Sequence, residues 1–192
     1  HWHACTAHNT FLVPSTGGLL PGRRHCLHAD VTACMHVLTH QPVPADSIGK
    51  GGITKNKAEG DLCTPAGTWA LKRVFYRGDR IKEPETGLQT FSISKNMGWS
   101  DDPNDKKSYN TLITKPHSYS HEDLWRSDNI YDIIVELGYN DNPPIIGKGS
   151  AIFMHLARDN FEPTAGCVAL KSFDLISLLS LVKRGDLLNI IK

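Results

Sequence analysis

The sequence lacks the features that define several classes of protein. No apolar run approaches the roughly 20 residues that a helix needs to cross a bilayer, and no secretory signal peptide is visible. The formal net charge is only +1, so composition gives no case for binding nucleic acid or an anionic membrane. The chain begins at His1 rather than at Met, as a processed or trimmed product does, so the missing signal leaves the compartment open.

Cysteine is scarce, and its spacing excludes the common cysteine motifs. The five cysteines are Cys5, Cys26, Cys34, Cys63 and Cys167. No C-x-x-C pair occurs, which argues against a zinc knuckle and against a thioredoxin-type motif. The odd count leaves at least one thiol free unless it pairs between chains. The sequence favours neither oxidised bridges nor reduced thiols for the others.

The first 45 residues differ from the rest of the chain. Seven of the ten histidines lie there, but no ligand spacing repeats, so we predict no metal site. We interpret residues 1–45 as an extension of unknown role with a short strand near Phe11–Val13. The turn residues of QPVPAD mark its end, and residues 46–192 are expected to form the main domain.

That domain is predicted to be mainly β, with one or a few helices and long loops. The β-branched and aromatic residues of Thr68–Tyr76 are typical of a strand. Apolar runs predict three more strands, over residues 130–140, 150–157 and 186–192. The long polar segment between residues 77 and 129 is predicted to be irregular. Its length indicates either an insertion that covers a substrate or a flap over a sheet edge.

One helix is expected, over residues 171–185. Ser172 is a suitable N-cap, Lys183 and Arg184 fall in the last turn, and Gly185 is a suitable end. Its predicted apolar face consists of Leu175, Leu178, Leu179 and Val182.

The stretch PTAGCVAL, residues 163–170, raises the question of what Cys167 does. A core residue, half of a disulfide and a nucleophile are all compatible with this stretch alone. His155 lies upstream in an apolar strand, where a histidine is costly unless its ring nitrogens are paired. The residues between them allow the chain to turn and return beside that strand. A Cys167–His155 pair would supply a nucleophile and its base.

The residues just before Cys167 fit an active-site loop, formed by Thr164, Ala165 and Gly166. Glycine permits a tight backbone and the close approach of a substrate. The backbone N–H groups of Gly166 and Cys167 would then face a developing oxyanion.

Separated stretches of the chain resemble the L,D-transpeptidases, the YkuD-type catalytic domain. In FMHLARDNFEPTAGCVAL, His155 and the TAGC of residues 164–167 match the family's histidine and Ser/Thr-x-Gly-Cys motif. KAEGDLCTPAGTW, residues 57–69, is similar to its glycine-rich segment. SHEDLWRSDNIYD and GYNDNPP resemble one bacterial branch. The resemblance covers residues 48–192 and implies a β-sandwich catalytic domain with long loops.

Two positions depart from the family's pattern. Ala165 and Ala169 stand where many members carry a histidine and an arginine, which help to hold the oxyanion or bind a substrate carboxylate. Other side chains must then contact the substrate. The candidates are His121, Arg126, Tyr139, Asn140 and Asp141. A loop hydrogen bond or a surface charge explains each of them equally simply.

The resemblance implies a cysteine-dependent peptidoglycan L,D-transpeptidase of cell-wall biogenesis and cell shape, in the bacterial periplasm or cell envelope. Its Cys167 thiolate would attack the diaminopimelate carbonyl of a donor tetrapeptide stem and release D-Ala. An amine acceptor would resolve the thioester into a diaminopimelate–diaminopimelate crosslink. No metal or cofactor is needed. A carbapenem is expected to acylate Cys167, because its strained lactam mimics the reactive carbonyl.

Alternatives remain open at this point. Water as the acceptor would make the protein an L,D-carboxypeptidase, and a protein amine would make it an enzyme that attaches a protein to peptidoglycan. A non-catalytic wall-binding or metal-binding protein, with Cys167 buried or in a disulfide, is supported only by the histidine-rich start. No nucleic acid, and no membrane span, is expected under any of these interpretations.

Overall fold

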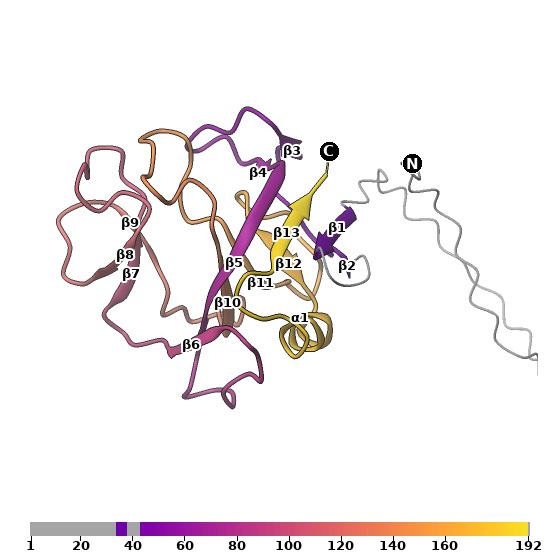
Figure 1. Ribbon diagram of the computed structural model, residues 1–192. Coiled ribbons are helices and arrows are strands. Elements are labelled where there is room, and N and C mark those ends of the chain that lie inside the picture. The colour runs from indigo at the N-terminus through magenta and orange to yellow at the C-terminus, as the bar shows by residue number, and fades with distance from the viewer. Residues whose placement is uncertain (1–33, 38–42, 192) are drawn as a thin grey trace, which may run out of the picture. The chain divides into compact units, whose positions relative to one another are not determined.

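The computed structural model describes residues 34–37 and 43–191, and the side chains of residues 45–191 (Figure 1). The predicted strand near Phe11–Val13 and the histidine-rich segment lie outside the described residues. The division of the chain at residue 45 stays a prediction. No helix within the described ranges is long and apolar enough to cross a membrane.

An eight-stranded sheet organises the domain. Its strands run in the order β12 (Val168–Leu170), β11 (Phe153–Leu156), β10 (Ile133–Leu137), β5 (Gly67–Tyr76), β13 (Leu187–Ile190), β1 (Cys34–Val37) and β2 (Val43–Pro44), and β6 (Gln89–Ser92) also pairs with β5. The first half of β5 pairs with β13 and the second half with β10 and β6. The four predicted strands are confirmed, with shorter limits at three of them.

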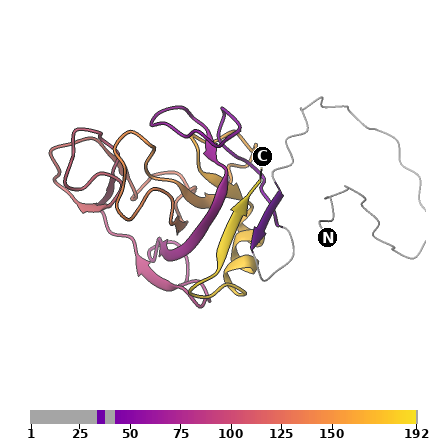
Figure 2. The ribbon, with the colours of Figure 1, turned by 45° about the horizontal axis from the view of Figure 1, so that its top comes forward.

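The segment between residues 77 and 129 is more regular than predicted. Besides β6, it forms a three-stranded sheet in the order β8 (Leu112–Thr114), β7 (Met97–Ser100) and β9 (His121–Asp123), which lies beside β10 on the side away from the helix (Figures 1 and 2). Strands β3 (Ile53–Thr54) and β4 (Thr64–Pro65) form a short parallel pair. The irregular prediction was wrong because strands of three or four residues show no usable alternation.

Consecutive residues of the central strands alternate between two hydrophobic clusters. The aliphatic face includes Val74, Val135, Met154 and Val168, with the buried residues of the helix. The aromatic face includes Phe75, Ile134, Phe153 and Cys167, and it packs against Trp99 and Leu124 of the polar segment and against Tyr131, just before β10. The polar segment therefore covers the sheet face that carries Cys167.

The helix, α1 (Ser172–Leu179), is shorter than predicted, although its apolar face is buried as expected. The N-cap is Lys171 rather than Ser172, and no side chain caps the helix. The carbonyl of Val182 accepts a hydrogen bond from Gly87 N–H, and Lys183 N–H donates to the Asp186 carboxylate. These bonds hold the turn after the helix, and Lys183 and Arg184 lie in that turn.

Candidate active site

His155 lies on β11 and Cys167 directly precedes the adjacent strand β12, on the same face of the sheet. Successive side chains of β11 point to opposite faces of the sheet, so that Phe153 belongs to the aromatic face and Met154 to the aliphatic face. His155 lies two residues after Phe153 and therefore points to the same, aromatic face. In the parallel pairing of β11 and β12, His155 is opposite Ala169, and Cys167 directly precedes β12. Both side chains line one cleft of about 260 Å³.

His155 is held as a neutral imidazole with one nitrogen free. Its side chain is buried, with the residue 5% exposed, and Nδ1 lies 2.8 Å from the carbonyl oxygen of Leu156. This contact assigns the proton to Nδ1 and leaves a lone pair on Nε2, which has no hydrogen-bond partner among the described residues. Burial, together with the charges of Arg126 and Arg158, lowers the pKa of His155 to about 4, although the hydrogen bond to Leu156 opposes this shift.

Cys167 is a neutral thiol in the ligand-free site. The residue is 8% exposed, and burial raises its pKa to about 12 although Phe153 N–H opposes this. Sγ accepts from Phe153 N–H at 3.4 Å and donates to the carbonyl oxygen of Ala151 at 3.2 Å. The thiol proton therefore faces Ala151 rather than His155, and no preformed thiolate exists at neutral pH.

The loop before Cys167 depends on glycine and on a threonine hydroxyl. Gly166 has φ of 139°, and a Cβ there would lie 2.9 Å from the carbonyl oxygen of Cys63. The hydroxyl of Thr164 donates to the carbonyl oxygen of Cys167 at 2.6 Å and accepts from Gly166 N–H at 3.1 Å. Because Gly166 N–H is engaged in the ligand-free site, its role as an oxyanion donor stays a prediction.

An edge segment at residues 46–50 holds both flanks of this loop. Ser47 pairs with Ala169 in both directions, through N–H to carbonyl bonds of 3.1 and 2.8 Å. Thr164 N–H donates to the carbonyl of Ile48 at 2.9 Å, and Lys50 N–H donates to the carbonyl of Thr164 at 2.9 Å. The backbone on either side of Cys167 is therefore fixed by a segment far away in the sequence.

Asn110 holds the backbone of Ala151, whose carbonyl oxygen accepts the hydrogen bond from the Cys167 thiol. Its buried Oδ1 accepts from Trp99 Nε1 at 2.9 Å and from Ala151 N–H at 3.0 Å. Its Nδ2 donates to the carbonyls of Tyr139 and Asn140 at 3.1 and 2.7 Å. Ala151 has φ of 51°, a conformation that alanine rarely adopts. Asn110 therefore links the polar segment to the position of Cys167.

Several residues of the cleft wall were missed by sequence reasoning. Besides Cys167, His155, Thr164, Ala165 and Arg126, the lining includes Glu122, Tyr131, Arg158 and Glu162. The Tyr131 ring meets the His155 ring edge-on, with centroids 5.3 Å apart. Glu122 and Tyr131 belong to the stretch SHEDLWRSDNIYD, so the resemblance contained a signal for them. Arg158 and Glu162 lie in FMHLARDNFEPTAGCVAL, which also resembles the family, but neither was predicted as a site residue.

The other predicted substrate contacts do not line this cleft. His121 Nδ1 lies 2.9 Å from the carbonyl oxygen of Tyr119. Tyr139 donates to the carbonyl of Lys148, the side-chain amide of Asn140 bonds the carbonyls of residues 145 and 149, and Asp141 pairs with Lys72 at 2.6 Å. Each of these contacts holds a loop, and the substrate roles of these four residues stay predictions.

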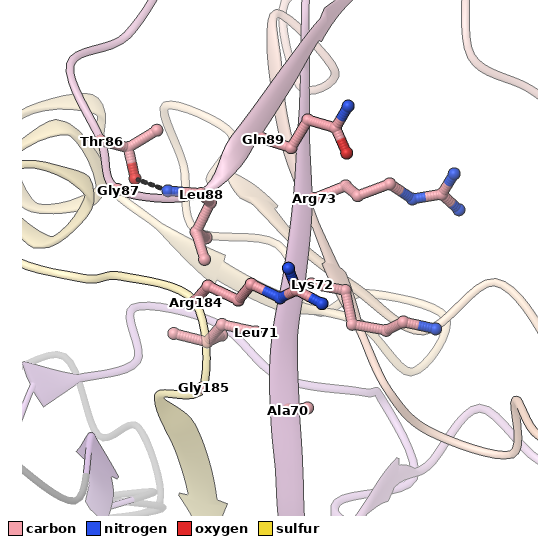
Figure 3. Close-up of a pocket in the computed structure, with 10 residues that line it drawn as sticks. All are labelled: Ala70, Leu71, Lys72, Arg73, Thr86, Gly87, Leu88, Gln89, Arg184 and Gly185. Atoms are coloured by element: carbon pink, nitrogen blue, oxygen red, sulfur yellow. Dashed lines mark hydrogen bonds between the residues drawn. The ribbon is translucent and has the colours of Figure 1, made fainter.

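A larger cleft of about 840 Å³ lies elsewhere, between β5, the start of β6 and the turn before β13 (Figure 3). It is lined by Lys72, Arg73, Arg184 and seven mostly small or apolar neighbours. Its lining holds no cysteine or histidine, and Glu136 pairs with both Lys72 and Arg73. The smaller cleft is therefore the candidate active site. No cluster of metal-ligating side chains occurs in the part of the chain that the structure describes.

One of three comparisons with known proteins gives a match. The family model for the L,D-transpeptidase catalytic domain, YkuD, matches residues 40–190. Neither the curated proteins nor the solved structures gave a match. The matched residues include every strand of the main sheet except β1, together with both Cys167 and His155. The chain therefore belongs to the L,D-transpeptidase catalytic domain family.

Proposed function

We propose that the protein is a peptidoglycan L,D-transpeptidase whose nucleophile is Cys167 and whose general base is His155. The observation that carries the proposal is their arrangement in one cleft, with His155 on β11, Cys167 directly before the adjacent β12, and His155 Nε2 free to accept a proton. A histidine fixed through Nδ1 and open at Nε2 is oriented for proton transfer. The family match supports action on peptidoglycan in general, and the finer assignments below are ours.

The first step forms a thioester with the donor. Because the resting thiol and imidazole are both neutral, His155 must remove the proton as sulfur attacks, after the thiol turns away from Ala151. Sulfur bonds to the diaminopimelate carbonyl carbon of the tetrapeptide stem. The C–N bond to D-Ala then breaks, and the imidazolium gives its proton to the leaving amine. The energy of the peptide bond is retained in the thioester.

The second step transfers the acyl group to an amine. The amine of a second diaminopimelate attacks the thioester carbonyl and loses its proton to His155. Cys167 leaves as the thiol, and a diaminopimelate–diaminopimelate crosslink is formed. Backbone N–H groups of the active-site loop would stabilise the oxyanion in both steps. This substrate places the protein in the cell envelope, and in the periplasm if the cell has an outer membrane.

Product analysis tests the proposal. Disaccharide-tetrapeptide is incubated with the wild type, Cys167→Ala and a matched Cys63→Ala control, and the products are identified by mass spectrometry. We expect crosslinked dimers from the wild type and from Cys63→Ala, and none from Cys167→Ala. Tripeptide without dimer would assign the site to an L,D-carboxypeptidase. Turnover by Cys167→Ala would contradict the nucleophile assignment.

A carbapenem provides a second test of the nucleophile. Its strained lactam is expected to acylate Cys167, and the adduct should appear in the wild type and in Cys63→Ala but not in Cys167→Ala. Peptide mapping that places the adduct on another residue would contradict the assignment.

A further inference from the structure

Two guanidinium groups line the cleft, and their hydrogen bonds differ. Arg126 is engaged through all three of its guanidinium nitrogens: Nε and Nη2 each donate to Asp128 at 2.8 Å, and Nη1 donates to Glu122 at 3.2 Å. Its guanidinium also lies 5.2 Å from the centre of the Tyr131 ring. A bidentate, charge-assisted pair of this kind is among the stronger contacts on a protein surface. Arg126 is therefore committed to holding the cleft wall together.

Arg158 is loosely held by comparison. Its nearest carboxylates are Asp128 at 3.5 Å and Glu162 at 3.7 Å, both longer than a normal hydrogen bond. Both oxygens of Asp128 are already occupied by Arg126. The Arg158 side chain is 43% exposed, so its planar donor fork can turn to an incoming anion at small cost.

The location of Arg158 suits a substrate contact. It follows β11, three residues after His155, and it lines the same cleft as Cys167. Its charge acts on the imidazole and contributes to the lowered pKa of His155. The position opposite His155 in the sheet is Ala169, which is buried and carries no charge. A carboxylate in this cleft must therefore contact a charged side chain at another position of the lining.

We infer that Arg158, rather than Arg126, binds a free carboxylate of the donor peptide and takes the place of the arginine that many family members carry at position 169. The inference rests on the proposed function. The donor has two such carboxylates near the scissile bond: that of the terminal D-Ala, and that of the distal centre of diaminopimelate. Both present the planar anion that a guanidinium binds in a bidentate manner.

The experiment measures KM and kcat for the wild type, Arg158→Gln, Arg158→Lys and the control Arg184→Gln, which removes an exposed arginine of the larger cleft (Figure 3). The donors are the tetrapeptide, its C-terminal amide, and the tetrapeptide amidated at the distal carboxylate. For the unmodified donor we expect Arg158→Gln to raise KM by about 10-fold to 100-fold with a smaller change in kcat. Arg158→Lys should recover part of this loss, and Arg184→Gln should match the wild type.

The amidated donors identify the carboxylate. Amidation of the group that Arg158 binds should raise KM for the wild type and have no further effect on Arg158→Gln. Equal KM values for the wild type and Arg158→Gln, or the same loss on amidation in both, would overturn the inference while leaving the proposed function intact.

A binding measurement keeps the two proposals separable. In a Cys167→Ala background, affinity for the unmodified tetrapeptide is measured with and without Arg158→Gln by isothermal titration calorimetry. A loss of about 10-fold or more is expected even if turnover is absent. Absence of turnover in the wild type would defeat the proposed function, and unchanged binding in this pair of variants would defeat the inference.

Discussion

The two faces of the sheet use neighbouring residues for opposite purposes. On the aliphatic face, Met154 and Val168 are completely buried among leucine, isoleucine and valine side chains. On the aromatic face, Cys167 and His155 stand next to them in the chain but line a cleft. The comparison teaches that β11 and the segment entering β12 supply stability on one side of the sheet and reactive groups on the other.

Burial has a different consequence on each face. For Met154 and Val168 it removes apolar surface from water, which stabilises the fold. For Cys167 and His155 it opposes charge, which raises the pKa of the thiol to about 12 and lowers that of the imidazole to about 4. The reactive pair is therefore kept neutral until a substrate arrives.

The largest expected effects come from replacing one side chain on each face of the sheet. His155→Gln should lower kcat/KM by about 10²-fold to 10⁴-fold, because the general base is lost, with little change in melting temperature. Met154→Ala should lower the free energy of unfolding by about 2–5 kcal/mol through the cavity it leaves, and should keep the wild-type kcat per folded molecule. Steady-state kinetics and urea denaturation of both variants check the pair. Loss of stability in His155→Gln with full activity would break the comparison.

Gly166→Ala should have the next largest effect, on both activity and stability. The backbone conformation at Gly166 disfavours a side chain, and the new Cβ would meet the carbonyl oxygen of Cys63 at 2.9 Å. We expect a cost of about 1–3 kcal/mol and a displaced Cys167. Gly147→Ala is the control, because Gly147 has φ of 80° but nothing within 4 Å of a new Cβ. Kinetics as poor in Gly147→Ala as in Gly166→Ala would show that displacement of the loop is not the cause.

Asn110→Ala tests the link between the polar segment and the thiol. The substitution leaves Trp99 Nε1 and Ala151 N–H without their acceptor, at about 1–3 kcal/mol for each buried group. We expect lower stability and a lower kcat, because Ala151 no longer holds the thiol in place. Asn104→Ala, at an exposed asparagine, is the control. A variant that loses stability but keeps kcat would remove Asn110 from the site.

Some of these features could be predicted from the sequence, and the reasons are local. Strand β5 has a dense run of β-branched and aromatic residues, and the Cys167 and His155 segment matches a family motif. The strands β7 and β9 could not be predicted, since MGWS and HED carry no alternation. The turn after α1 is held in part by Gly87, which lies far away in the sequence. Arg158 lies in the stretch that resembles the family, but its exposure and its weak pairing with Asp128 and Glu162 depend on how the loops pack.

The smallest expected effect is a change in the pH dependence of stability. The pKa of Cys167 is raised from 9.0 to about 12 by folding, so the unfolded chain loses this proton first and stability falls as pH rises above about 9. Cys167→Ala should make the decline between about pH 9 and 11 shallower, as measured by urea denaturation across that range.

The pKa of His155 is lowered from 6.5 to about 4, so His155→Gln should lessen the loss of stability as pH falls below about 6.5. If the free energy of unfolding depends on pH in the same way in each variant and in the wild type, these assignments are contradicted.

The central claim is that Cys167 forms a thioester with the donor and that His155 drives this step. Intact-protein mass spectrometry of the enzyme, quenched in acid after mixing with a tetrapeptide donor, tests it most directly. The account predicts an added mass equal to the donor minus D-Ala, located on Cys167 by peptide mapping and absent from His155→Gln over the same time. An acyl group on Cys63, or product formation by Cys167→Ala, would contradict it.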